Sequence, residues 1–189
     1  MSERWRCFVA APIPDDVRRT LAAAVAPWRE SAGVEGLRWA DPDGWHVTLA
    51  FLGSVAADTV DGLVADVRRT AAGHAPLALA GDAIGAFPSP RRATVVWCGI
   101  LDADGSLERL ALALRSVLGV DLDQPFRAHL TLARTRGRPL DLAEFIAGTA
   151  VQPISFRVER VELMRSHLGR GPARYEVIAS APLGAAVRV

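Results

Sequence analysis

Histidine and threonine recur at the same spacing in two segments of the chain that are otherwise mostly hydrophobic. His46 and Thr48 lie in the run WHVTLAFL, and His129 and Thr131 lie in the run AHLTLA. Branched and aromatic residues favour β-strands, and successive side chains of a strand point to opposite faces. Each run therefore predicts a strand that carries an imidazole and a hydroxyl on one face and hydrophobic side chains on the other.

If the two strands face one cleft, two imidazoles and two hydroxyls converge on a single small site. Histidine has an ordinary pKa of about 6.5, so one ring can accept a proton from water while the other donates one to a leaving oxygen. Thr48 and Thr131 would then donate hydrogen bonds to the non-bridging oxygens of a phosphate. Arg134, five residues after His129, would neutralise charge on them. This chemistry requires no metal ion.

One His-x-Thr pattern alone is weak evidence, because histidine is also an ordinary strand residue. Two copies, each followed by leucine within an apolar strand, favour function over coincidence. The sequence contains no CxxC or HExxH pattern, no GxxxxGK[ST] loop and no Gly-x-Ser-x-Gly elbow. Of the two remaining histidines, His74 is predicted to lie in solvent at a helix end, and His167 in a surface loop.

The composition is that of a globular protein of 189 residues with 23% charged residues and a net charge of +1. We expect one domain spanning 1–189 and no strong general attraction to nucleic acid. All 22 basic residues are arginine. Cys7 and Cys98 lie in apolar strand-like runs, which favours reduced, buried cysteines in a cytoplasmic protein. The sequence shows no apolar stretch of the roughly 20 residues that span a bilayer and no signal peptide.

Hydrophobic periodicity predicts the element order βαββαββα followed by βαββ. The first His–Thr strand is expected to end at Gly53-Ser54, and Asp58 to cap the helix that follows. Residues 85–92 are predicted to form a rigid loop, and residues 154–164 to form one alternating strand. Because each His–Thr strand is accompanied by a helix and further strands, the pattern favours an α+β fold of two similar lobes, each with an antiparallel sheet flanked by helices.

The sequence resembles the 2H phosphoesterase superfamily, and within it the RNA 2′,3′-cyclic phosphodiesterases of the LigT type, formerly called 2′-5′ RNA ligases. The resemblance extends over nearly the whole chain. Its matching segments are RCFVAAPIP (6–14), WHVTLAFLG (45–53), GAFPSPRR (85–92), PFRAHLTLAR (125–134), LMRS (163–166) and RYEV (174–177). The paired His-x-Thr motifs mark the superfamily, and the FPSP and HLTLAR strings are specific to this branch.

The resemblance implies a bilobal fold with a central cleft between two pseudo-symmetric, intertwined lobes. It also implies that the protein hydrolyses RNA 2′,3′-cyclic phosphate ends to 2′-phosphates, without a metal or other cofactor. At the matching motif positions, His46 would be the proton donor to the departing 3′ oxygen, and His129 the proton acceptor that activates water. The expected partners are RNA ends or cyclic nucleotides, and the protein is expected to be a monomer.

Three further residues are candidates for flanking the substrate, although ordinary packing explains them equally well. Phe87 lies in the FPSP segment, Arg127 belongs to a basic cluster near the second motif, and Tyr175 offers a ring for stacking. Two other functions stay open. The same histidines can run ring opening in either direction, as a 2′-5′ RNA ligase or 2′,5′-phosphodiesterase does, and a noncatalytic RNA-binding module would keep the cleft without the chemistry.

Overall fold

The computed structural model describes residues 3–31, 34–149, 151–167 and 173–184. Helices lie between the strands as far as β7, the last three elements are strands, and all paired strands of the described residues are antiparallel. The elements are β1 (Arg4–Pro12), α1 (Asp15–Val25), η1 (Ala26–Glu30), β2 (Leu37–Trp39), η2 (Pro42–Gly44), β3 (His46–Ala56), η3 (Ala57–Thr59), α2 (Val60–Ala72), β4 (Leu77–Phe87), η4 (Pro90–Arg92), β5 (Val95–Leu101), α3 (Ser106–Val117), β6 (His129–Thr135), α4 (Ala143–Ala147), β7 (Ile154–Val158), β8 (Arg160–His167) and β9 (Arg174–Pro182).

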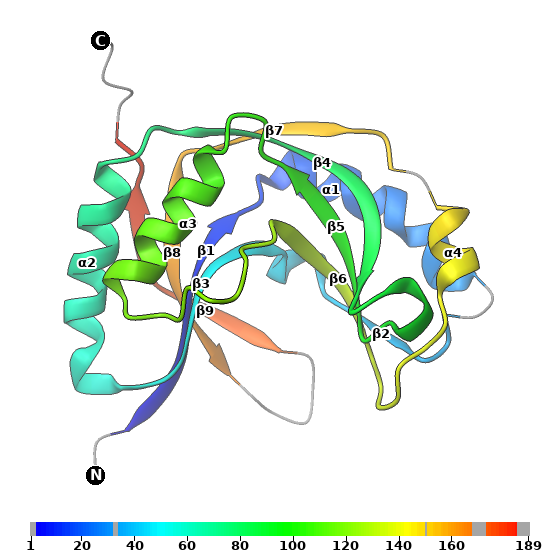
Figure 1. Ribbon diagram of the computed structural model, residues 1–189, viewed down its shortest axis with the longest axis horizontal. Helices are drawn as coiled ribbons and strands as arrows, with labels where there is room; N and C mark the ends of the chain where they lie inside the picture. Colours follow the sequence, from blue (N-terminus) through cyan, green and yellow to red (C-terminus); the bar gives the residue numbers. More distant parts are fainter. Residues whose placement is uncertain (1–2, 32–33, 150, 168–172, 185–189) are drawn as a thin grey trace.

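The strands of the described residues form one curled sheet in the order β7-β4-β5-β6-β3-β1-β8-β9, with β2 paired to β6. In Figure 1 this sheet forms an arch, with α2 and α3 on one side and α1 and α4 on the other. One half runs from β9 to β3 and the other from β6 to β7. The halves meet where Val47 of β3 pairs with Leu130 of β6. The predicted α+β, bilobal fold is therefore confirmed, with the two lobe sheets joined edge to edge through the two His–Thr strands.

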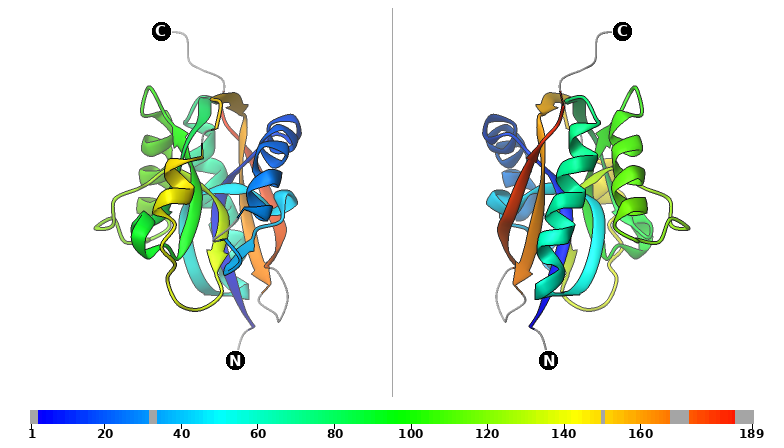
Figure 2. Two further views of the ribbon diagram at one scale, coloured as in Figure 1. Left: turned by 90° about the vertical axis from the view of Figure 1, so that its right-hand side faces the viewer. Right: turned by 90° about the vertical axis from the view of Figure 1, so that its left-hand side faces the viewer.

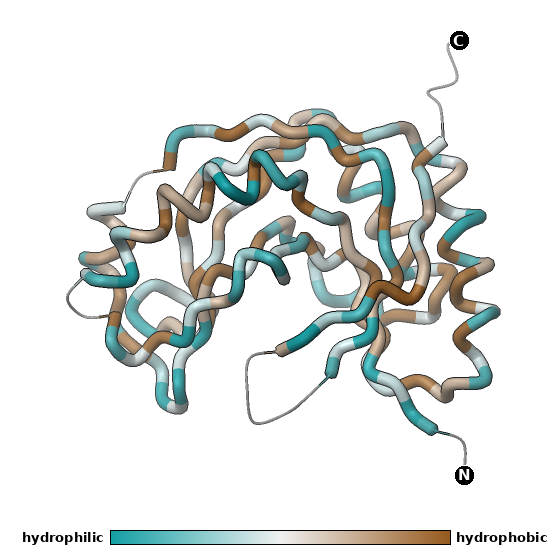
Figure 3. Tube along the Cα trace, turned by 180° about the vertical axis from the view of Figure 1, so that it is seen from behind, coloured by the Kyte–Doolittle hydropathy of each residue, from teal (hydrophilic) through white to brown (hydrophobic). Residues whose placement is uncertain are grey.

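The hydrophobic core lies behind those two strands. Figure 2 shows α2 lying between α3 and the β8–β9 hairpin, and Figure 3 shows hydrophilic and hydrophobic residues alternating along the helix, as one buried face requires. The alternate side chains of β3 and β6 pack into this core, so their other face is left for the site. The core includes Val47, Leu49, Leu130 and Leu132 from these strands, Val60, Val67 and Ala71 from α2, and Leu107, Leu110, Ala111 and Leu114 from α3.

Both His–Thr strands carry a β-bulge at the residue after the threonine. In β3 the pairing with β1 skips Leu49, and in β6 the pairing with β5 skips Leu132. A bulge inserts one extra residue and reverses the alternation beyond it. Phe51 and Arg134, each five residues after its histidine, are therefore both exposed. Strict alternation would have turned Arg134 away from His129, so the bulge is what directs this arginine to the same face.

Two predicted boundaries around the first motif are wrong. Strand β3 does not end at Gly53-Ser54, because Gly53 adopts a φ of 69° at a second bulge and the strand continues to Ala56. A positive φ costs glycine little, so here the residue bends the strand without terminating it. Asp58 does not cap α2, which begins after a short 3₁₀ turn with Thr59 at the N-cap position and no capping hydrogen bond from its side chain.

Two further predicted boundaries are also corrected. Gly85 to Phe87 belong to β4 and not to a loop, and the Trp97 ring of β5 fills the space that a side chain at Gly85 would need. The alternating segment 154–164 is two strands that separate at Glu159. Strand β7 pairs with β4 at one edge of the sheet, and β8 pairs with β1 in the other half. The hydrophobic alternation shifts by one residue at this break, from Val158 to Val161, and the prediction of a single strand missed that shift.

Cys7 and Cys98 are both buried and free, as predicted. Burial raises the pKa of the Cys98 thiol to about 11 and also raises the pKa of Cys7. Within the described ranges, no helix has the length and apolar character needed to cross a membrane.

Candidate active site

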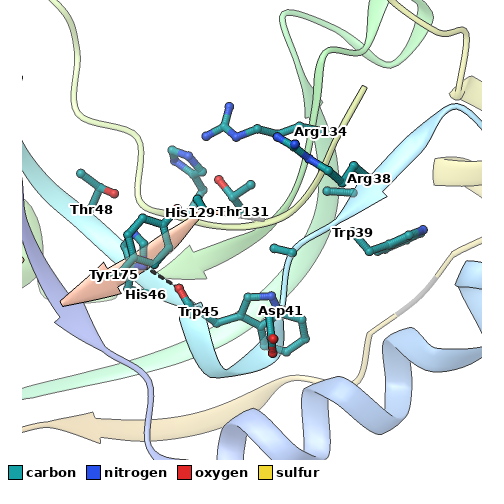
Figure 4. A pocket seen from close by; sticks show the side chains of 14 residues that line it. Arg38, Trp39, Asp41, Trp45, His46, Thr48, His129, Thr131, Arg134 and Tyr175 are labelled. Atoms are coloured by element: carbon teal, nitrogen blue, oxygen red, sulfur yellow. Dashed lines mark hydrogen bonds between the residues drawn. The ribbon is translucent and has the colours of Figure 1, made fainter. Parts of the chain in front are cut away.

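The candidate site lies at the join between the two halves of the sheet, where β3 pairs with β6. Val47 pairs with Leu130, and the strands are antiparallel. His46 therefore lies beside Thr131, and Thr48 lies beside His129, on the face opposite the core. Figure 4 shows these four side chains around one cavity. The two motifs are thus related by an approximate twofold rotation about the Val47–Leu130 pair.

His46 is held in one orientation by its neighbours. Its Nδ1 donates a hydrogen bond to the carbonyl oxygen of Gly44 over 2.7 Å. The Tyr175 ring meets the imidazole edge-on, with ring centroids 5.0 Å apart, and the Phe8 ring lies 4.8 Å away. Burial lowers the pKa of His46, the hydrogen bond to Gly44 opposes that shift, and the charges of His129 and Arg134 lower the pKa further.

His129 is held in the same manner from the other half of the sheet. Its Nδ1 donates to the carbonyl oxygen of Arg127 over 2.7 Å. The Phe87 ring meets this imidazole edge-on, with centroids 5.1 Å apart. Burial lowers the pKa of His129, the hydrogen bond to Arg127 opposes that shift, and the charge of Arg134 adds to the lowering.

These two hydrogen bonds determine which ring nitrogen of each histidine can transfer a proton. A carbonyl oxygen only accepts, so Nδ1 carries the proton in both rings. In the neutral imidazole, Nε2 is then a lone-pair acceptor, and in the charged imidazolium it is a donor. Each histidine can therefore move a proton at Nε2 while Nδ1 holds the ring in place.

A cavity of about 170 Å³ extends from the two histidines along β2 and β6. The chain runs beside β6 as far as Ala40, whose amide donates to the Leu132 carbonyl over 2.8 Å. It then leaves β6 and pairs with it again at Val47, and the cavity forms between these two contacts. Six of the residues predicted from sequence line this cavity. They are His46, Thr48, His129, Thr131, Arg134 and Tyr175. Gly44 leaves room for the Tyr175 ring, which would lie 3.3 Å from a Cβ at that position.

Phe87 and Arg127, the other two predicted residues, lie on the opposite side of His129. They line a second, more open groove of about 560 Å³, together with Thr48, His129, Phe51 and Phe126. The guanidinium of Arg127 lies 5.8 Å from the centroid of the Phe87 ring, within the range of a cation–π contact. The predicted residues therefore divide between two hollows that share Thr48 and His129.

Four residues that the sequence patterns did not single out also line the first cavity. Arg38 and Trp39 come from β2, Asp41 from the turn that follows, and Trp45 from the residue before His46. Trp45 is only 4% exposed. The signal in the sequence that could have revealed Arg38 is its position in an otherwise apolar short strand just before the first His–Thr strand. Arg38 reaches the cavity only because β2 pairs with β6, and the sequence does not display that pairing.

The remaining histidines lie outside this cavity. His74 follows the end of α2. His167 is the last residue of β8 and not a loop residue as predicted, and its Nε2 lies 2.8 Å from Oε2 of Glu176 on β9. Throughout the part of the chain that the structure describes, no three histidine, cysteine, aspartate or glutamate side chains gather in the way that metal ligands do.

Known proteins with this architecture were found by both sequence and structure. An RNA 2′,3′-cyclic phosphodiesterase of Archaeoglobus fulgidus is 31% identical, over 75% of this chain and 78% of that protein. One of Escherichia coli is 31% identical, over 93% of this chain and 94% of its own. The crystal structure of Escherichia coli LigT complexed with 3′-AMP superposes with a TM-score of 0.74 at 28% identity, covering 96% of this chain and 99% of LigT.

The family model "LigT like Phosphoesterase" matches residues 11–97 and 101–175. The two matched segments contain both His–Thr strands, all of β2 and the first residues of β9. Because the model spans most of the sequence and the relatives align over three quarters of it or more, the chain belongs to the family of LigT-like phosphoesterases.

Proposed function

We propose that the protein hydrolyses 2′,3′-cyclic phosphate ends of RNA to 2′-phosphates, without a metal ion, by proton transfer between two histidines. Relatives named RNA 2′,3′-cyclic phosphodiesterase support the substrate class. The observation that supports the mechanism is the matched pair of Nδ1 hydrogen bonds, which leave Nε2 of His46 and of His129 as the nitrogen that can exchange a proton.

In the proposed reaction, water attacks phosphorus on the side opposite the 3′ oxygen. His129 accepts the proton of this water at Nε2 as the new P–O bond forms. His46 donates its Nε2 proton to the 3′ oxygen as the P–O3′ bond breaks, which leaves a 2′-phosphate and a 3′-hydroxyl. The bound phosphate anion favours the charged form of His46, opposing the burial that lowers its pKa in the free protein.

The other cavity residues suit the charge that develops on the phosphate. Thr48 and Thr131 lie on either side of the Val47–Leu130 pair, where their hydroxyls can donate to the two non-bridging oxygens. Arg134 contributes a guanidinium on the same face. Donors fixed in advance stabilise such a transition state without reorganisation, so these three residues are proposed to bind the reacting phosphate.

The groove beside His129 favours a second reaction at the same site. Attack opposite the 3′ oxygen comes from the His129 side, where the groove lined by Phe87, Phe126 and Arg127 is larger than a water molecule requires. A ribose 5′-hydroxyl that occupies this groove would give a 2′-5′ linkage, and the reverse reaction would cleave one. Product analysis on 2′-5′-linked oligomers distinguishes this ligase or 2′,5′-phosphodiesterase activity from hydrolysis.

The deciding experiment is to assay hydrolysis of RNA with a 2′,3′-cyclic phosphate end in the presence of EDTA, for the wild type, His46→Ala and His129→Ala. We expect turnover by the wild type alone and a 2′-phosphate product. Equal rates for the wild type and either variant would exclude two-histidine catalysis, and loss of wild-type turnover in EDTA would exclude metal independence.

A further inference from the structure

The end of the first cavity farthest from the histidines carries a pair of arginines. Arg38 of β2 lies directly opposite Arg134 of β6 in the antiparallel register. Side chains of directly opposed residues share one face, with Cβ atoms about 5 Å apart. Both arginines line the cavity, and Figure 4 shows the two side chains next to each other there.

This arrangement concentrates positive charge that the described residues do not neutralise. Like charges directly opposite each other on a sheet destabilise it. None of the ion pairs formed by the described residues involves Arg38 or Arg134. Asp41, the acidic residue among the described residues that line this cavity, accepts a hydrogen bond with its side chain from the Asp43 amide. Two adjacent guanidinium groups in a cavity offer planar donors that match an anion such as phosphate.

The reacting phosphate does not account for both arginines. The reacting phosphate is proposed to bind where β3 joins β6, at the Val47–Leu130 pair. Arg38 pairs four residues farther along β6, which corresponds to about 13 Å of strand. Arg134 starts from the same position on β6, but its charge reaches both histidines and lowers their pKa, whereas Arg38 is not among the causes of those shifts. Arg134 and the two threonines are therefore available to the reacting phosphate, and Arg38 is placed for a different anionic group of the same substrate.

The direction in which the substrate extends follows from the proposed roles of the histidines. His46 donates to the ribose 3′ oxygen, so the ribose lies on the His46 side of phosphorus. The cavity opens from that side, past Tyr175 and Trp45, toward Trp39 and Arg38. The 5′ side of the terminal nucleotide is therefore directed along the cavity toward the arginine pair.

We propose that Arg38, together with Arg134, forms a second anion subsite that binds the phosphate on the 5′ oxygen of the terminal nucleotide. This inference rests on the proposed function and specifies its substrate class. The preferred substrate carries a 5′ phosphate, either as a monoester or as the linkage to the preceding nucleotide. An adenosine 2′,3′-cyclic phosphate with a free 5′-hydroxyl is then a poorer substrate.

The test compares three substrates: adenosine 2′,3′-cyclic phosphate, its 5′-phosphorylated form, and the dinucleotide ApA with a 2′,3′-cyclic end. We expect the wild type to favour both phosphorylated substrates in kcat/KM by about tenfold or more, the size of one charged hydrogen-bonded contact. Arg38→Gln should lower this ratio toward one. Preference for the dinucleotide alone would assign the subsite to the internucleotide linkage, and preference for both would assign it to any 5′ phosphate.

Arg136→Gln is the matched control, because Arg136 is an exposed arginine just beyond β6 that does not line the cavity. This variant removes the same charge nearby and should keep the wild-type ratio. Equal loss of the ratio in both variants would show a general field effect and overturn the subsite. A wild-type ratio near one would also overturn it while leaving the proposed function intact.

Binding of products keeps the subsite testable if turnover is absent. Calorimetry should show that the wild type binds adenosine 2′,5′-bisphosphate about tenfold more tightly than adenosine 2′-phosphate, and that Arg38→Gln binds the two with similar affinity. Absence of turnover with this binding preference intact would refute the proposed reaction alone. Equal affinities of the wild type for both ligands would refute the subsite.

Discussion

Strands β3 and β6 hold their histidines in nearly the same way. In each strand, Nδ1 donates over 2.7 Å to the carbonyl two residues earlier, and an aromatic ring from another strand meets the imidazole edge-on. In each strand a bulge follows the threonine. The difference is the residue that each bulge exposes, which is Phe51 in β3 and Arg134 in β6.

The surroundings of the two exposed residues extend this difference. The Phe51 ring is covered by the guanidinium of Arg6 at 4.6 Å, whereas Arg134 lies opposite a second arginine, Arg38. Equivalent backbones thus present an aromatic surface at one end of the site and positive charge at the other. In the proposed mechanism, the shared backbone positions the two histidines, and the divergent side chains give the substrate a direction.

The largest expected effect comes from removing either proton carrier. His46→Ala and His129→Ala should each lower kcat by about a thousandfold or more, because each histidine serves one of two coupled transfers. Steady-state assays on a cyclic-ended oligonucleotide measure this. A variant that retains a tenth of the wild-type kcat would show that its half of the site is dispensable.

Next in size is the contrast between the two residues exposed by the bulges. Arg134→Gln should lower kcat/KM by about a hundredfold, because it removes charge stabilisation at the phosphate. It should also shift the pH–rate profile to higher pH, since the Arg134 charge lowers the pKa of both histidines. Phe51→Leu should change kcat/KM by about twofold at most. Comparable losses in the two variants would refute the proposed division between the strand ends.

The two threonines should behave alike. Thr48→Val and Thr131→Val keep the shape and strand propensity of the side chain and remove the hydroxyl, so each should lower kcat by about tenfold to a hundredfold. Thermal unfolding of both variants controls for loss of fold. Losses that differ by more than about tenfold would show that the approximate twofold symmetry does not extend to phosphate contacts.

The smallest effect concerns a feature that β3 has and β6 lacks, the second bulge at Gly53. Gly53→Ala places a side chain at a φ of 69° and should lower the free energy of unfolding by about 1 kcal/mol. Urea denaturation measures this, and kcat should stay at the wild-type value. A large fall in kcat would mean that the bulge also positions the site.

The sequence predicted the shared face of each His–Thr strand well, because alternation along a strand depends only on local geometry. Alternation alone places His46 and Thr48 on one face of their strand, and His129 and Thr131 on one face of theirs. The sequence also led to the family, which the comparisons confirm, along with the expected phosphodiesterase class. The α+β fold with two lobes followed from the pattern of strands and helices around the two motifs and from the same resemblance.

What the sequence did not predict depends on contacts between distant segments. The bulge that turns Arg134 toward His129 is defined only by pairing with β5, and Arg38 joins the site only through pairing with β6. Both features are set by register, which a single sequence does not show. The break at Glu159 is different, because the buried positions shift by one residue there and the sequence pattern carried a signal that the prediction of one strand missed.

The most direct test of the central claim is the pH dependence of kcat/KM for the wild type and both histidine variants. The proposed reaction requires His46 charged and His129 neutral, so the wild type should give a bell-shaped profile. Burial lowers both pKa values below the usual value of about 6.5, and the maximum, which lies between them, should therefore fall below about pH 6.5.

Each variant should lose one limb of this bell. The residual activity of His46→Ala should rise with pH to a plateau, because only the neutral form of His129 is then required. The residual activity of His129→Ala should fall as pH rises, because only the charged form of His46 is then required. Exchanged limbs would reverse the roles of the two histidines, and a bell that persists in both variants would contradict two-histidine catalysis.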